Sequence, residues 1–96
     1  MSTIQFSDDN GKTWKPCESG GFSGIDGGRG VAYNPATNVW VAVGQDTTEK
    51  TIQRSIDDGK TWNSCESGGF AGNTGLGVAY NPVTNRWVAV GDINPA

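Results

Sequence analysis

The sequence repeats itself once, and this repeat is the feature that most limits the folds open to the chain. The segment Cys-Glu-Ser-Gly-Gly-Phe at 17–22 returns at 65–70, 48 residues later, and Trp-Val-Ala-Val-Gly at 40–44 returns at 87–91, 47 residues later. One residue is lost in the Gly-rich sequence between the two motifs of the second copy, where a loop tolerates a deletion. A period of this length indicates supersecondary units that stack on one another to share a core.

Turn chemistry divides each period into four short strands. Residues 51–55 are β-prone and end at Asp-Asp-Gly, a hairpin signal, after which 61–66 reads as the partner strand. Residues 78–81 and 86–90 flank Asn-Pro-Val-Thr-Asn, where proline presets φ and the second asparagine tolerates a left-handed position. The 15 glycines and the absence of histidine fit many tight turns, and we expect an all-β fold.

The strand at 39–43 is apolar on both of its faces. Its valines alternate with Trp40 and Ala42, and successive side chains of a strand point to opposite sides of the sheet. Such a sheet must be covered on both sides. Sheets stacked around a common axis cover one another without helices, which is the arrangement of propeller blades.

Charge and hydropathy exclude several classes of partner. Ten acidic and seven basic residues give a net charge of −3, which predicts neither a nucleic-acid partner nor an anionic membrane surface. The first residues lack the features of a signal peptide and no apolar stretch approaches the roughly 20 residues of a membrane helix. We therefore expect a cytoplasmic location as expressed. Cys17 and Cys65 hold equivalent positions in the two copies, which predicts two free, half-buried thiols.

Two segments resemble a known motif. Residues 7–14 and 55–62 both match Ser-x-Asp-x-Gly-x-Thr-Trp, the Asp-box. Asp-box (BNR) repeats occur in β-propellers such as sialidases and sortilin-like receptors, where the motif turns between the third and fourth strands of a blade. The resemblance implies blades of four antiparallel strands, with a half-blade at 1–18, a full blade at about 30–66 and a half-blade at 77–91.

The motif residues have structural roles in this interpretation. The aspartates are expected to accept hydrogen bonds from turn amides, the glycines to supply positive φ, and the tryptophans to pack beneath the hairpin. The residues concerned are Ser7, Asp9, Gly11, Thr13, Trp14, Ser55, Asp57, Gly59, Thr61 and Trp62. A calcium loop is the alternative, because Asp8, Asp9 and Asn10 cluster and Asp57 and Asp58 repeat the pattern, but the spacing differs from that of an EF-hand. We expect no metal and no cofactor.

Catalytic patterns are missing from the chain. Without histidine there is no Ser-His-Asp or Cys-His base. Sialidases hold the substrate carboxylate with three arginines, whereas Arg29, Arg54 and Arg86 are not equivalent in the repeat: Arg54 lies on a strand, Arg86 follows a turn, and Arg29 is expected in a loop between blades. We therefore expect no enzyme activity.

The two half-blades suggest how the chain functions. It begins with the third strand of a blade and ends after the second strand of another, so we expect a self-assembling scaffold whose ring is closed by homo-oligomerisation with shared, strand-swapped blades. Four chains giving eight blades is the expected size, with three or five chains as alternatives. The similarity of the copies is typical of a recent duplication or of an engineered, symmetrised fragment.

The alternative function is a carbohydrate-binding, lectin-like propeller module. A glycan would bind the face formed by loops 18–29, 44–51 and 66–76. Its candidate contacts are Glu18, Phe22, Glu66 and Phe70, for which loop packing is the competing interpretation.

Overall fold

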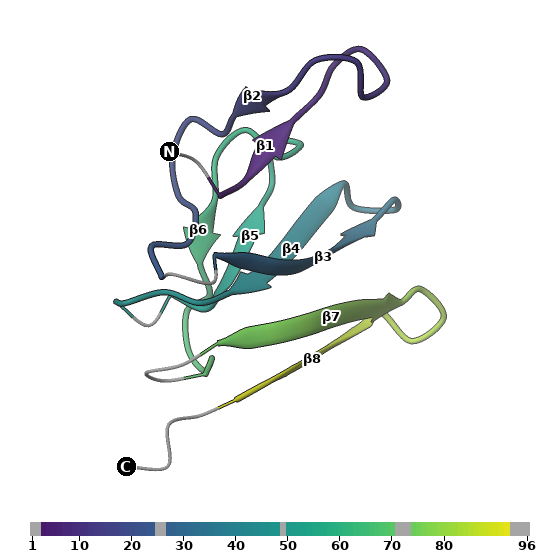
Figure 1. Ribbon diagram of the computed structural model, residues 1–96. Helices are drawn as coiled ribbons and strands as arrows, with labels where there is room; N and C mark the ends of the chain where they lie inside the picture. Colours follow the sequence, from purple (N-terminus) through teal and green to yellow (C-terminus); the bar gives the residue numbers. More distant parts are fainter. Residues whose placement is uncertain (1–2, 25–26, 49, 71–73, 93–96) are drawn as a thin grey trace.

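The computed structural model describes residues 3–24, 27–48, 50–70 and 74–92, and it arranges them in three antiparallel sheets. The first sheet pairs β1 (Gln5–Phe6) with β2 (Lys15–Pro16). The second has the order β3 (Gly28–Asn34), β4 (Val39–Gly44), β5 (Ile52–Ser55) and β6 (Asn63–Ser64), and the third pairs β7 (Gly75–Asn81) with β8 (Arg86–Gly91). Figure 1 shows the four-stranded sheet between the other two.

The expected all-β class is confirmed for the described part of the chain, in which no helix forms. Within these residues, accordingly, no helical segment is long and apolar enough to cross a membrane.

The hairpins β3–β4 and β7–β8 are structural copies of each other. Tyr33 pairs with Trp40 and Tyr80 with Trp87, and in each pair the ring centroids lie 4.5 Å apart. Each turn is closed by an asparagine with positive φ, 61° at Asn38 and 58° at Asn85. The tyrosine hydroxyls donate to the side chains of these asparagines, which fixes both hairpins in the same register.

Both long hairpins begin earlier than the sequence predicted. β3 starts at Gly28 and β7 at Gly75, because the ladder continues past a bulge to pair these glycines with Gly44 and Gly91. Arg29, expected in a loop, therefore lies on β3.

The outer strand expected at 61–66 is reduced to the two residues of β6. Two hydrogen bonds take its first residues out of the ladder. The Thr61 amide donates to the Asp57 carboxylate, and the Trp62 amide donates to the Ser19 carbonyl, in the loop that follows the N-terminal sheet.

The core lies between the N-terminal sheet and the four-stranded sheet. Phe22, Ala42 and Trp62 are buried there, with Ile4, Cys17 and Trp40 packed around them. On the opposite face of the four-stranded sheet Val43 is fully buried. A Cβ added to Gly30 would come within 3.3 Å of the Gly77 Cα, so glycine allows the strands to approach closely there. Each face of the four-stranded sheet therefore has a neighbouring sheet packed against it, which covers at least part of that face.

Neither Cys17 nor Cys65 forms a disulfide, and both side chains are half-buried, as the sequence predicted.

Candidate interaction site formed by open sheet edges and a groove

The two Ser-x-Asp-x-Gly-x-Thr-Trp segments, named turn I (residues 7–14) and turn II (residues 55–62), are closed by their own side chains. In turn I, Ser7 Oγ accepts from the Gly11 amide at 2.8 Å, and Asp9 Oδ1 accepts from the Thr13 amide at 2.8 Å. The Thr13 hydroxyl donates to the second carboxylate oxygen. Turn II repeats these bonds with Ser55, Asp57, Gly59 and Thr61.

The carboxylates of both turns are held in the ionised form. Hydrogen bonds from the Thr13 hydroxyl and amide, with a further one from Ser7, lower the pKa of Asp9 to about 2. The corresponding donors, Thr61 first, lower the pKa of Asp57 to about 2. Both oxygens of each carboxylate face donors of their own turn, and in the described ranges no three acidic or cysteine side chains converge on a metal position. This geometry builds turns.

The equivalent tryptophans of the two turns differ in burial. Both indole N–H groups donate to a glycine carbonyl of their turn, at 3.0 Å in turn I and 2.9 Å in turn II. Trp62 is 4% exposed, but Trp14 is 57% exposed, contrary to the expectation that it packs beneath its hairpin. The N-terminal sheet consists of β1 and β2 alone, so it has no inner hairpin like β3–β4 to cover Trp14.

Among the residues that the structure describes, β1 and β8 each have a partner strand on one side only. β5 lies between β4 and β6, whereas its repeat equivalent β1 pairs with β2. β4 lies between β3 and β5, whereas its equivalent β8 pairs with β7. Burial follows this difference, since Val43 on β4 is 0% exposed and the equivalent Val90 on β8 is 59% exposed. Within the described residues, β1–β2 therefore has no neighbouring hairpin like β3–β4 in its sheet, and β7–β8 has none like β5–β6.

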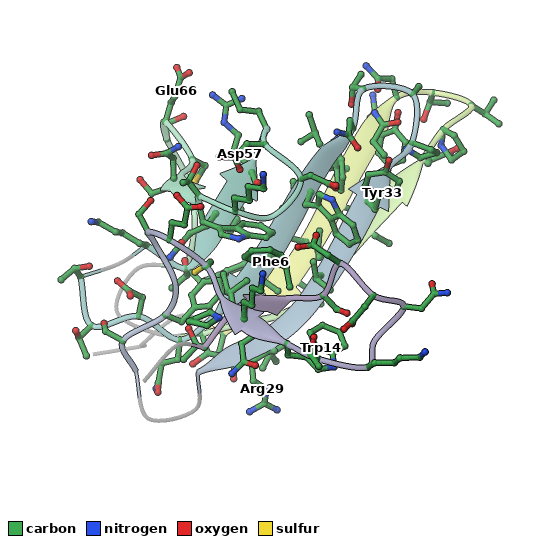
Figure 2. All side chains as sticks on the ribbon, turned by 90° about the horizontal axis from the view of Figure 1, so that it is seen from above. Phe6, Trp14, Arg29, Tyr33, Asp57 and Glu66 are labelled. Carbon is green, nitrogen blue, oxygen red and sulfur yellow. The ribbon has the colours of Figure 1, made fainter. Side chains whose placement is uncertain are left out.

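A groove separates β1 and turn I from the face of the four-stranded sheet. Apolar side chains contributed from both sides line much of it, including Phe6, Trp14, Val31, Trp40 and Ala42. Figure 2, a view from above, shows Phe6 over the strands of the four-stranded sheet. Val31 is 55% exposed in this groove, although its equivalent Val78 is half-buried at the contact of β7 with the four-stranded sheet. The groove is therefore an apolar surface that lacks its cover.

The contact between the N-terminal sheet and the four-stranded sheet is repeated by the contact between the four-stranded sheet and β7–β8. The Phe22 amide donates to Thr3 Oγ1 at 2.7 Å, and the equivalent Phe70 amide donates to Thr51 Oγ1 at 2.8 Å. A Cβ added to Gly28 would lie 3.3 Å from the Thr3 carbonyl oxygen.

The matching contact on the other side of the four-stranded sheet is nearly the same. A Cβ added to Gly75 would lie 3.2 Å from the Thr51 carbonyl oxygen, and 2.7 Å from Val43 Cβ. At Gly28 the valine equivalent to Val43 is Val90, which lies on the far side of the molecule, on β8. The N-terminal sheet thus sits on the four-stranded sheet as that sheet sits on β7–β8, with one hairpin missing from the arrangement.

A second surface is also filled once and open once. Gly20 has φ of 88°, and a Cβ there would come within 2.4 Å of the Trp62 carbonyl oxygen. The equivalent Gly68 has φ of 87°, and a Cβ there would meet nothing within 4 Å. Loop 66–70 therefore presents, without an occupant, the surface on which loop 18–22 receives turn II.

The candidate glycan contacts do not converge on one site. Phe22 is in the core, and Phe70 is half-buried, its ring Cγ 2.9 Å from where a Cβ on Gly91 would lie. Glu66 is exposed and lies 3.7 Å from the Arg54 guanidinium, and Glu18, its equivalent in the first repeat, is also exposed. These positions favour loop packing for the two phenylalanines. The three arginines lie on three different strands, and Figure 2 shows Arg29 pointing outward.

Sequence reasoning missed Asp46, which accepts more hydrogen bonds than any other carboxylate that the structure describes. Asp46 is buried, and burial opposes its ionisation, but hydrogen bonds from Thr48, Ser23 and Lys50 hold its pKa well below the usual range. It ties loop 22–24 to the connection between β4 and β5. The Asp-Thr-Thr sequence is the only local signal, since Asp hydrogen-bonds the backbone two residues on, and the equivalent position of the second copy is Ile93.

Comparison of the chain with protein-family models, with curated proteins and with solved structures finds no match.

Proposed function

We propose that the chain is a self-assembling structural scaffold without catalytic activity, in which the β7–β8 hairpin of one copy completes the β1–β2 sheet of the next. The observation that carries the proposal is the paired contrast in burial between equivalent residues. Val43 and Trp62 are covered because β3–β4 and β5–β6 lie in one sheet that packs on β7–β8 and on the loop after β2, and Val90 and Trp14 are exposed because their hairpins are apart. Joining two copies gives the exposed residues the surroundings of the covered ones.

The exposed strand edges and apolar side chains of the single chain support the same proposal. β8 presents one edge of a six-residue strand, and free edges of this kind pair readily with other chains. Exposed apolar side chains flank both edges, among them Val88 and Val90 on β8, and Trp14 and Val31 beside β1. A contiguous apolar surface rimmed by polar residues is typical of a protein interface.

The proposed interface joins two different surfaces, the β8 edge of one copy and the β1 edge of another. Heterologous contacts of this type form a ring when the rotation between copies closes. Each copy supplies the equivalent of two blades, so a closed β-propeller holds an even number of them. We propose four copies and eight blades, within the range of about four to eight typical of propellers, with three or five copies as the neighbouring solutions.

The test is the concentration dependence of molar mass, measured by sedimentation and native mass spectrometry. The parent chain is expected to form one closed species, and Val90→Asp is expected to abolish it by placing a carboxylate at the joint. Val83→Asp, at an exposed valine of the β7–β8 turn, is the matched control and should assemble like the parent. A parent chain that stays monomeric up to hundreds of micromolar, or a Val90→Asp variant that assembles normally, would refute the proposal.

A further inference from the structure

This inference rests on the proposed assembly and concerns the residue that directs it. Within the chain, four residue pairs join β4 to β5: Trp40–Ser55, Val41–Arg54, Ala42–Gln53 and Val43–Ile52. The repeat offsets place the corresponding residues of two copies opposite each other. The pairs between copies are Trp87–Ser7, Val88–Phe6, Ala89–Gln5 and Val90–Ile4.

Three of these four pairs have the same residue types in both joints. The only difference is on the acceptor strand, where Arg54 of the internal joint is replaced by Phe6 in the joint between copies. Apart from this residue, a β8 edge meets the same pairing partners on β1 as it would on β5. Phe6 is therefore the one paired residue that can tell the two acceptor strands apart.

Arg54 and Phe6 lie in different surroundings. The Arg54 side chain is half exposed and its guanidinium lies 3.7 Å from the Glu66 carboxylate, so it meets solvent and a charge. Phe6 is half-buried on the groove, with its Cβ 3.9 Å from the position that a Cβ on Gly59 would occupy. The same groove contains Val31, so an aromatic side chain is already seated where the missing hairpin would arrive.

We propose that Phe6 is the specificity-determining residue of the assembly, which makes β1 select the β8 edge of a second copy. Phe6 and Val88 form a cross-strand aromatic and β-branched pair, one of the favourable combinations on a sheet face. Both then pack toward Val31 of the four-stranded sheet. A hairpin that exchanged onto β5 would place Val88 beside Arg54 and would have to displace β3–β4.

The experiment measures dissociation constants by sedimentation velocity for four variants, with near-ultraviolet circular dichroism as the check on folding. Phe6→Arg is expected to weaken association about tenfold or more, the effect of removing an interface anchor. Val88→Glu is expected to do the same from the donor side. The double variant F6R/V88E places opposite charges directly across the joint and should recover most of the lost affinity. Val83→Arg, with the same type of change outside the joint, should match the parent.

The outcomes separate this inference from the assembly itself. A parent chain that never associates would overturn both. A parent that associates, with Phe6→Arg equally associated, would overturn only the role of Phe6. A folded double variant no tighter than either single variant would show that positions 6 and 88 are not paired, which would also overturn the inference. Loss of affinity in Val88→Glu and its recovery in the double variant test the pairing even if Phe6→Arg alone disturbs the N-terminal sheet.

Discussion

The equivalent tryptophans offer the sharpest comparison of what the missing hairpin contributes. Trp14→Ala and Trp62→Ala remove the same side chain after the same threonine, and each removes one indole hydrogen bond to a glycine carbonyl of similar length. The contribution of this hydrogen bond therefore nearly cancels between the two variants. The remaining difference is burial, 57% exposed against 4%.

The magnitude follows from this difference. A tryptophan buries up to roughly 250 Å² when fully covered, so about half of it, ~130 Å², separates the two positions. At ~25 cal/mol per Å² this is about 3 kcal/mol. We expect Trp62→Ala to lower the free energy of unfolding of the lone chain by about 4 kcal/mol, within the range for large-to-small core changes, and Trp14→Ala by about 1 kcal/mol.

The assay is urea unfolding followed by far-ultraviolet circular dichroism, at a protein concentration where sedimentation shows single chains. At concentrations where the chain associates, the difference in unfolding free energy between the two variants should become smaller, because the proposed association buries Trp14. Equal losses for both variants in the lone chain would refute the reasoning, and so would a gap that does not change on assembly.

Three further predictions concern turns and loops. Gly68→Ala should lower the stability of the lone chain only by the strain of positive φ, about 1–2 kcal/mol. Gly20→Ala adds overlap with the Trp62 carbonyl and should lower the melting temperature further. Gly68→Ala should weaken association more than it lowers the stability of the lone chain. The folded-state pKa of Asp9 and Asp57, about 2, lies below the ordinary 3.8. The stability that the two ionised carboxylates contribute to the folded state is therefore fully present above about pH 4 and is lost as the pH falls through 2. Urea midpoints from pH 6 to pH 2 should show this loss, and D9N/D57N should flatten it. Asp46→Ala leaves the donors of Ser23 and Thr48 without their acceptor and should cost about 1–3 kcal/mol, measured by thermal unfolding, while Asp8→Ala, on the exposed turn I, should change little.

The repeat and the turn residues were enough to predict the strands and their antiparallel pairing, because those features are local. Asn38 and Asn85 close their hairpins with positive φ, as expected for asparagine in a turn. The first residues of β3 and β7 were missed, since glycine has low strand propensity and only the partner strand draws Gly28 and Gly75 into the ladder. Closure into a ring remains a prediction.

The site was harder to predict than the fold because it depends on what lies between sheets. Nothing in the local sequence separates Trp14 from Trp62, or Gly20 from Gly68; their difference in cover comes from which hairpins the chain brings together. The Asp46 network was missed for a related reason. It joins loops 22–24 and 46–50, whose contact no periodic pattern encodes.

The unequal ladders of the hairpins bear on how the molecule reaches its folded state. β3–β4 and β7–β8 pair along whole strands, and such local hairpins form within about 1–10 μs. The ladders of β1–β2 and β5–β6 each have two paired positions and one further backbone hydrogen bond, from Cys17 to Ile4 and from Cys65 to Ile52, which is too little to persist alone. β5–β6 can pair with β4 of its own chain, whereas in the proposed assembly β1–β2 would pair with β8 of another chain. We therefore expect refolding to show a fast phase independent of concentration and a slower, second-order phase in which the N-terminal sheet consolidates.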